Sequence, residues 1–294
     1  MRNVTLSIAM LACASTAFAQ NFPVTLKSTE VIPGMFMLEG EGGFAGGNMT
    51  LLVGDDRIFL IDDGIEAIGP KLIETAAELA GRPVDFVINT HVHGDHVGSN
   101  AALASDGAVV VAHDNIRKRL LEDSAEAGGP GGLPVVTFAD AVTFFVNGHE
   151  AFVFHVAAAH TDGDAVIHFR DVNIIHAGDV HFNYLFPFID LDTGGSIAGF
   201  LTAQRRMLAL ADDETVIIPG HGPLASKADL QAAVDMLADS QARVATLVDQ
   251  GMSEEDIVAA NPLALYHDDW NWDFITTERM TRTLIRSMAA EQAE

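Results

Sequence analysis

The sequence contains a single cysteine, Cys13, and it lies within the first 20 of the 294 residues. These residues, MRNVTLSIAMLACASTAFAQ, join a positively charged start to an apolar run and a small-x-small sequence, Ala17-Phe18-Ala19, as a secretory leader does. A mature protein cleaved after residue 19 would contain no cysteine. This excludes disulfide bonds, thiolate metal ligands and cysteine nucleophiles. We expect a signal peptide at residues 1–19, a single domain at 20–294 with helices at its C-terminal end, and a periplasmic or secreted location.

Positive charge is scarce, because 16 Lys and Arg residues stand against 41 Asp and Glu residues, for a net charge of -25. Such a field repels phosphate backbones and anionic membrane surfaces, so we expect no nucleic-acid partner. Beyond the leader, no apolar run approaches the roughly 20 residues that cross a membrane. A small-molecule substrate is the partner that these exclusions favour, and the sequence leaves the oligomeric state open.

Short apolar runs predict strands, and longer stretches with helical periodicity predict helices. The predicted strands are Met35–Leu38, Met49–Val53, Ile58–Ile61, Val84–Ile88, Val109–Ala112, Val142–Val146, Phe152–Val156, Val166–Phe169, Asn173–His176 and Val216–Ile218. The predicted helices are Ala67–Ala80, Asn115–Leu121, Ile197–Leu210, Lys227–Gln250 and Thr277–Ala289. Groups of strands with helices between them indicate two packed sheets covered by helices on the outside.

A cluster of metal-ligand residue types follows the predicted strand Val84–Ile88, in the sequence THVHGDH. In extended backbone, His91 and His93 point the same way, so both imidazoles can reach one metal ion. A turn at Gly94 would let Asp95 and His96 face a neighbouring position. This pattern predicts two adjacent metal ions.

The cluster resembles the HxHxDH signature of the metallo-β-lactamase superfamily, which His91, His93, Asp95 and His96 match in full. The resemblance covers at least residues 35–225 and implies an α/β fold, the four-layer αββα sandwich, with metals at one edge of the sheets. The family's remaining ligands match three later residues, namely His160, Asp179 and His221.

Carried over position by position, the resemblance implies a first zinc ion on His91, His93 and His160, a second on Asp95, His96 and His221, and a bridge through Asp179. The cofactors expected are therefore two Zn²⁺ ions, with iron or manganese as alternatives. A metal-bound hydroxide would attack a carbonyl carbon while a metal polarises the carbonyl oxygen. Asp95, whose second oxygen can hold the hydroxide's proton, is the expected catalytic residue.

The resemblance leaves the substrate open among small esters, thioesters, lactones and β-lactams. Secreted class B β-lactamases often have a cysteine at the position of Asp179 and a lysine three residues later, where this chain has Phe182. Glyoxalase II relatives bind glutathione with a basic cluster, and none is evident in the C-terminal helices. A small, fairly apolar carbonyl substrate is the inference that remains.

Aromatic segments near the metal motifs have two interpretations. Residues Tyr184–Ile189, after the bridging aspartate, belong either to an apolar pocket wall or to the core, and neither is favoured. For Trp270 and Trp272, packing of the C-terminal region is preferred over capping of the pocket. His181, two residues after Asp179, is not expected to be a ligand because the metal spheres are filled without it.

Two other classes of function remain as alternatives. The same ligand set holds iron in oxidoreductases of this superfamily, and His and carboxylate ligands accept either metal. A non-catalytic metal-binding module would keep the fold without turnover, although such proteins usually lose ligands and this chain retains all seven.

Overall fold

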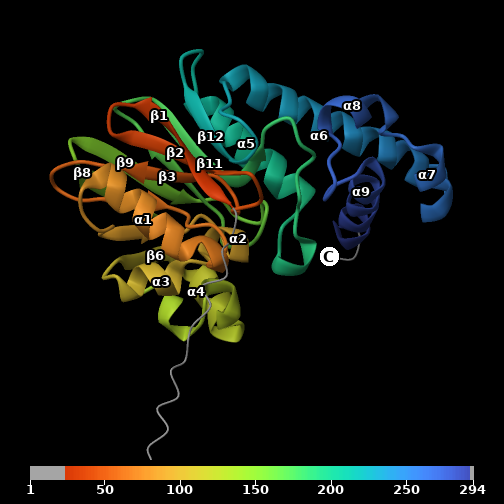
Figure 1. The fold of residues 1–294 in the computed structure, drawn as a ribbon. Helices are drawn as coiled ribbons and strands as arrows, with labels where there is room; N and C mark the ends of the chain where they lie inside the picture. The colour runs from red at the N-terminus through yellow and green to blue at the C-terminus, as the bar shows by residue number, and fades with distance from the viewer. Residues whose placement is uncertain (1–23, 292–294) are drawn as a thin grey trace, which may run out of the picture.

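Two β-sheets form the centre of the computed structural model, which describes residues 24–291 (Figure 1). The signal peptide predicted at residues 1–19 lies outside the described residues, and the single domain at 20–294 stays a prediction. The first sheet has the strand order β1 (Thr25–Ile32), β2 (Met35–Glu41), β3 (Met49–Leu52), β4 (Phe59–Ile61), β5 (Phe86–Ile88), β6 (Val109–His113), β7 (Val136–Phe138). Strands β1 to β4 pair antiparallel, whereas β4 to β7 pair parallel.

The second sheet contains five strands. Their order is β12 (Val216–His221), β11 (Ile174–Phe182), β10 (Ala165–Phe169), β9 (His149–His155), β8 (Ala141–Val146). Strands β8 to β11 are antiparallel neighbours, and β12 joins β11 in parallel.

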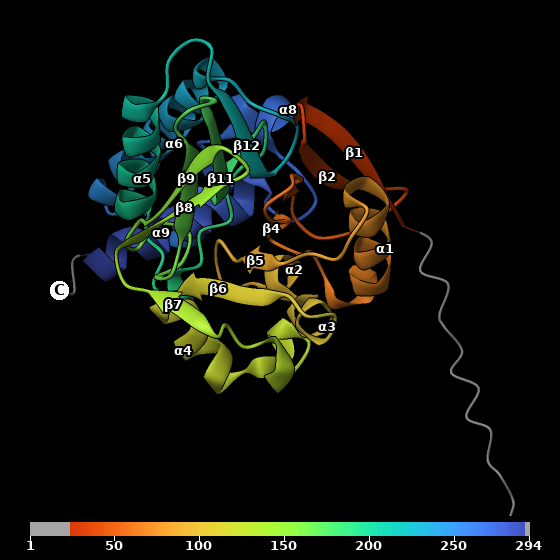
Figure 2. The same cartoon turned by 90° about the vertical axis from the view of Figure 1, so that its left-hand side faces the viewer.

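Helices cover the outer face of each sheet, and the helices at the C-terminal end pack against one another. Their bounds are α1 (Gly69–Ala80), α2 (Gly94–Val97), α3 (Asn100–Ser105), α4 (Asp114–Glu122), α5 (Ile197–Leu210), α6 (Lys227–Asp249), α7 (Glu254–Ala260), α8 (His267–Trp270) and α9 (Thr277–Glu291). Figure 2 shows α5 and α6 on one side of the paired sheets and α1 on the other.

Apolar side chains fill the spaces between these layers. Met35, Ile61 and Ile88 of the first sheet are buried in one cluster with Val153 and Ile167 of the second. A second cluster joins α1 to the outer face of the first sheet, and a third joins α5 and α6 to the second sheet. Because each sheet is apolar on both faces, both must be covered, and the expected four-layer αββα sandwich is confirmed.

The structure extends the predicted secondary structure in a few places. Strand β1 has the mixed sequence TLKSTEVI and lies at the sheet edge, so it has no apolar run to reveal it. Strand β11 continues past the predicted end at His176 to Phe182, and Asp179 lies inside it where the pairing with β12 changes register. Gly178, with φ of +50°, provides the backbone conformation for this irregularity.

The parallel strands β4, β5 and β6 all end at the same edge of the first sheet, and β11 and β12 run together in the second. Loops that follow these strands therefore meet at one side of the sandwich. Within residues 24–291, no helix combines the length and apolarity that crossing a bilayer requires.

Candidate metal centre

All seven predicted ligand residues meet at this edge of the sandwich. His91 and His93 follow β5, Asp95 and His96 lie in α2, and His160 comes from the loop between β9 and β10. The side chains fall into overlapping groups whose potential ligand atoms lie within 4.8 Å of one another: His91, His93, His160 and Asp179; Asp95, His96 and His221; Asp62, His91 and His96. Residues up to 159 positions apart in the sequence, Asp62 and His221, thus contribute to one polar cluster.

The carboxylate of Asp179 lies at the centre of the cluster. Its Oδ1 is 3.1 Å from Nε2 of His96, and its Oδ2 is 3.5 Å from Nε2 of both His160 and His221. Nε2 of His91 lies 3.7 Å from the same Oδ2. A carboxylate that faces both histidine groups is placed to bridge two cations.

Hydrogen bonds on the far side of three histidine rings determine which nitrogen faces the centre. Nδ1 of His96 donates to Oδ2 of Asp62 at 2.7 Å, and Nδ1 of His160 donates to the carbonyl oxygen of Phe188 at 2.7 Å. The Thr90 hydroxyl donates to Asp62 at 2.7 Å, so it accepts from Nδ1 of His91 at 3.0 Å. Each of these histidines therefore presents the lone pair of Nε2 to the centre.

His93 uses the opposite nitrogen. Its Nε2 donates to Oδ2 of Asp190 at 3.1 Å, and its Nδ1 lies 2.8 Å from Nε2 of His160. Both facing nitrogens carry lone pairs in these tautomers. The pair requires a cation or a shared proton between the two rings.

Other atoms of the cluster also lack the partner that a buried polar atom needs. Nε2 of His91 and Oδ1 of Asp179 are buried without a hydrogen bond among the described residues. Nε2 of His96 and Nε2 of His221 face each other at 3.3 Å. Imidazole nitrogen and carboxylate oxygen are ligands for zinc and for iron, so the donor set fits bound metal ions.

Burial and neighbouring charges set the ionisation of the cluster. Burial lowers the pKa of His160 to about 4, which keeps its ring neutral. Burial opposes the charged form of Asp179, but His96 and His221 outweigh it and hold the pKa of that carboxyl well below its usual range. For His221, burial is outweighed by the Asp179 carboxylate, which raises the pKa to about 9. The centre therefore combines anionic carboxylates with the neutral ring of His160, and it favours a positive charge at His221, which a bound metal ion would supply in place of a proton.

Two glycines allow the backbone to approach the ligands closely. A Cβ at Gly220 would lie 2.0 Å from Oδ1 of Asp179, and a Cβ at Gly47 would lie 2.1 Å from Cε1 of His96. Any larger residue at either position would displace a ligand side chain.

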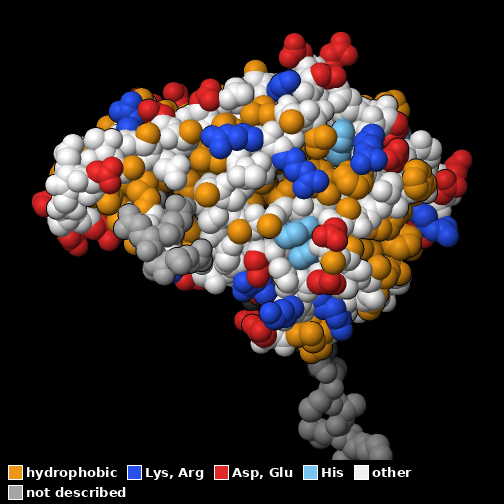
Figure 3. Space-filling model, turned by 180° about the vertical axis from the view of Figure 1, so that it is seen from behind, with side chains coloured by type: hydrophobic (Ala, Val, Ile, Leu, Met, Phe, Trp, Pro, Cys, Tyr) orange, Lys and Arg blue, Asp and Glu red, His pale blue; other side chains and the backbone are white. Residues whose placement is uncertain are grey.

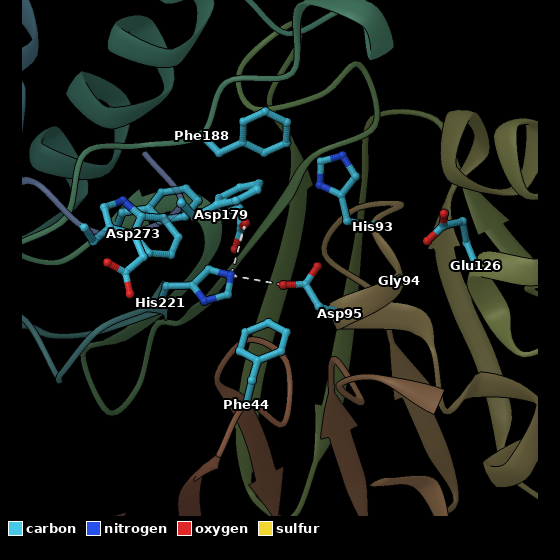
Figure 4. A pocket seen from close by; sticks show the side chains of 12 residues that line it. Phe44, His93, Gly94, Asp95, Glu126, Asp179, Phe188, His221 and Asp273 are labelled. Atoms are coloured by element: carbon cyan, nitrogen blue, oxygen red, sulfur yellow. Dashed lines mark ion pairs between the residues drawn. The ribbon is translucent and has the colours of Figure 1, made fainter. Parts of the chain in front are cut away.

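A cavity of about 700 Å³ opens onto the cluster. Figure 4 shows Phe44 and Phe188 on opposite sides of the site, with Asp95 and His221 between them. The ring of His221 stacks on Phe182 at a centroid distance of 5.2 Å. From behind, histidine side chains are visible at the surface beside acidic and hydrophobic ones (Figure 3).

The aromatic segments divide between the core and the cavity. Trp270 is buried and packs in the C-terminal core, as expected. Trp272 fits both interpretations, because it packs against the same core and also lines the cavity. Phe186 is buried in the core, but Phe188 lies on the cavity wall. His181 is fully buried and belongs to none of the ligand groups within the described chain.

The sequence interpretation missed the residues that orient the ligands. Asp62 is fully buried and accepts hydrogen bonds from His96 and from the backbone and side chain of Thr90. Asp190, which holds His93, lies in a loop 97 residues later in the chain. A signal existed for Asp62 alone, because it directly follows an apolar strand and polar residues there often face a functional edge.

Comparison with known proteins gives three kinds of match. The family model described as the Metallo-beta-lactamase superfamily matches residues 42–221. The probable metallo-hydrolase YqgX of Bacillus subtilis (strain 168) is 26% identical over 183 residues, covering 60% of this chain and 85% of that protein.

A hydroxyacylglutathione hydrolase of Polaromonas sp. is 28% identical over 149 residues, which are 49% of this chain and 51% of that protein. Among solved structures, a metallo-beta-lactamase from Pontibacter korlensis superimposes with a TM-score of 0.64 and 21% identity, covering 73% of this chain and all (100%) of that one. This structural likeness concerns the fold.

Proposed function

The chain belongs to the metallo-beta-lactamase superfamily, and we propose that it is a binuclear zinc-dependent hydrolase of a small ester, thioester, lactone or β-lactam. One observation carries this proposal: seven metal-ligand side chains from four separate segments converge on one centre, where Nε2 of His91 and Oδ1 of Asp179 are buried without a hydrogen bond. Its relatives include metallo-hydrolases, which supports hydrolysis as the class of reaction.

The two ligand groups correspond to two metal positions. His91, His93 and His160 would hold one ion, and Asp95, His96 and His221 would hold the other. Asp179 faces both groups and would serve as the bridge. When bound, zinc ions would act as Lewis acids, which lower the pKa of water so that hydroxide is available at neutral pH, and which polarise a carbonyl group.

Asp95 is the residue that we assign to proton transfer. It lines the cavity, and its Oδ2 lies 3.3 Å from Nε2 of His221. Its other carboxylate oxygen, Oδ1, can accept a proton from the attacking water and deliver it to the leaving group. Burial opposes ionisation of Asp95, but His96 and His221 lower the pKa of its carboxyl, so the carboxylate is ionised at neutral pH and has a lone pair available for the proton.

Metal analysis and a substrate panel test the proposal. The purified mature protein is analysed by inductively coupled plasma mass spectrometry and assayed with a chromogenic cephalosporin, a lactone, a thioester and a phosphodiester. We expect about two zinc ions per chain and turnover of at least one carbonyl substrate. Bound iron would favour the oxidoreductase alternative, and zinc without turnover of any substrate would favour a non-catalytic metal-binding module.

We also propose export of the protein to the periplasm or the medium, on the basis of the leader features at residues 1–19. The intact mass of protein recovered from osmotic-shock and medium fractions tests this. Loss of the first 19 residues supports export, and a full-length mass confined to the cytoplasm contradicts it.

A further inference from the structure

We propose that the cavity selects uncharged esters or lactones that carry a flat, aromatic or similarly apolar group, and discriminates against anionic substrates. This inference rests on the proposed function, because the cavity opens onto the same metal centre. It narrows the substrate class through residues that the metal motifs do not include.

An aromatic wall, formed by Phe188, Trp272 and Phe274, lines one side of the cavity. The ring of Phe274 lies 5.4 Å from that of Phe188 and 5.5 Å from that of Trp272, and both contacts are edge-to-face. Nε1 of Trp272 donates a hydrogen bond to the carbonyl oxygen of Phe186 at 2.9 Å. This bond fixes the indole ring, so the wall is formed before a substrate enters.

Phe44 forms the opposite side of the opening. It lies parallel to the ring of His221, with 7° between the two planes and 6.4 Å between centroids, and its side chain is 58% exposed. An exposed aromatic ring beside a metal centre gives a flat apolar group a surface to stack on. The substrate group would therefore lie between Phe44 and the aromatic wall.

Apart from the histidines assigned to the metal ions, the ionisable residues around the cavity are all acidic. Asp95, Glu126 and Asp273 line it together with the bridging Asp179, and no Lys or Arg belongs to the lining within the described part of the chain. A substrate carboxylate away from the metals would face these acids without a cation to pair with. Juxtaposed like charges disfavour binding, so an anionic group distant from the reacting carbonyl should weaken it.

Arg279 lies beside the wall, but its guanidinium contacts the wall residues and does not face the cavity. The carbon at the centre of its guanidinium lies 4.1 Å from the centroid of Phe274 and 5.2 Å from that of Phe188. Its Nη1 also donates to the carbonyl oxygen of Phe274 at 2.9 Å. Arg279 borders a separate hollow, so it supports the wall by a cation–π contact and does not line the cavity.

A matched pair of esters tests the charge preference. 4-Nitrophenyl butyrate and mono-4-nitrophenyl succinate share a leaving group and acyl length, and differ by a terminal carboxylate. With the purified zinc-loaded chain, we expect kcat/KM to favour the butyrate by at least about tenfold after subtraction of the spontaneous hydrolysis of each ester, which for the succinate includes attack by its own carboxylate. Asp273→Asn should lower the butyrate-to-succinate ratio of kcat/KM. A ratio of one, or a preference for the succinate, would overturn the inference.

Substitutions in the wall test the aromatic contribution. Phe274→Ala should raise KM for 4-nitrophenyl benzoate about three- to tenfold with a smaller change in kcat, since it removes one aromatic contact. The matched control is Phe145→Ala, which truncates an exposed phenylalanine outside the cavity and should leave KM unchanged. Equal effects of the two substitutions would contradict the role of the wall.

A binding measurement separates this inference from the proposed hydrolase function. Trp270 and Trp272 are the two tryptophans of the sequence, and 4-nitrobenzyl alcohol is a neutral quencher of their fluorescence. We expect saturable quenching. Its dissociation constant should rise in Trp272→Phe and in Phe274→Ala, and it should be higher for 4-nitrobenzoate than for the alcohol. If this holds while no substrate is hydrolysed, the hydrolase proposal fails and the selectivity of the cavity stands. Hydrolysis of a substrate without such binding would support the hydrolase proposal and overturn the proposed selectivity of the cavity.

Discussion

The ligand cluster and the aromatic wall lie side by side, yet they are built in different ways. His91, His96 and His160 are almost fully buried, and Nδ1 of each ring makes a hydrogen bond that sets the orientation of the ring. In the wall, Phe274 is 47% exposed and is held by ring contacts and Arg279. Substitutions in the cluster would therefore break hydrogen bonds and disturb the site, whereas substitutions in the wall should cost little stability. In our proposal the first supports the chemistry and the second selects the substrate.

Removal of the proposed bridging carboxylate should have the largest effect. Asp179→Ala deletes the carboxylate that faces both histidine groups, so we expect loss of one metal ion per chain and a fall in turnover of at least about a hundredfold. Metal analysis of the purified variant, together with the ester assay, checks this. Unchanged metal content and turnover would remove Asp179 from the bridge.

Loss of an orienting residue should weaken the cluster less. Asp62→Ala removes the acceptor for Nδ1 of His96 and for Thr90, and should lower metal affinity about ten- to a hundredfold. Competition with a chromophoric chelator measures this affinity. Asp56→Ala, at an exposed loop residue, is the control. Equal affinities of the two variants would show that Asp62 does not orient the ligands.

The free energy of unfolding should decrease in acid because of buried His176. Burial lowers the pKa of His176 to about 4, below the ordinary value of 6.5. The unfolded chain therefore binds more protons between these values, and stability must fall as the pH drops through that range. From pH 7 to pH 5 this residue should cost about 2 kcal/mol.

Urea unfolding of His176→Asn and of the exposed-residue control His267→Asn at both pH values measures this contribution. The control should lose as much unfolding free energy between pH 7 and pH 5 as the unmodified chain, and His176→Asn should lose less. Identical pH dependence in both variants would assign the sensitivity to other groups.

The smallest effect on the metals is expected at the cavity opening. Phe44→Ala should leave metal content unchanged and alter the free energy of unfolding by less than about 0.5 kcal/mol, because its side chain is exposed. KM for an aromatic ester should still rise about three- to tenfold. A loss of metal in this variant would show that the opening and the cluster are not separable as proposed.

The sequence by itself determined the core of the fold and the candidate ligands. Apolar runs identified ten strands of the two sheets, since burial on both faces demands continuous hydrophobic sequence. The dense HVHGDH segment identified the site, because so many ligand types in six residues are rare in a core or on a plain surface. The three later ligands were identified through the resemblance, and the structure places them beside the first four.

The tertiary structure alone decided the features that depend on distant contacts. Asp62 and Asp190 have no ligand motif around them, and their role follows from the rings that they reach across the fold. Phe44 and Trp272 are 228 positions apart, and they line one cavity only because the first sheet and the C-terminal segment meet there. Local sequence reports burial and backbone preference, whereas the partner of an isolated side chain is fixed by the packing of the whole chain.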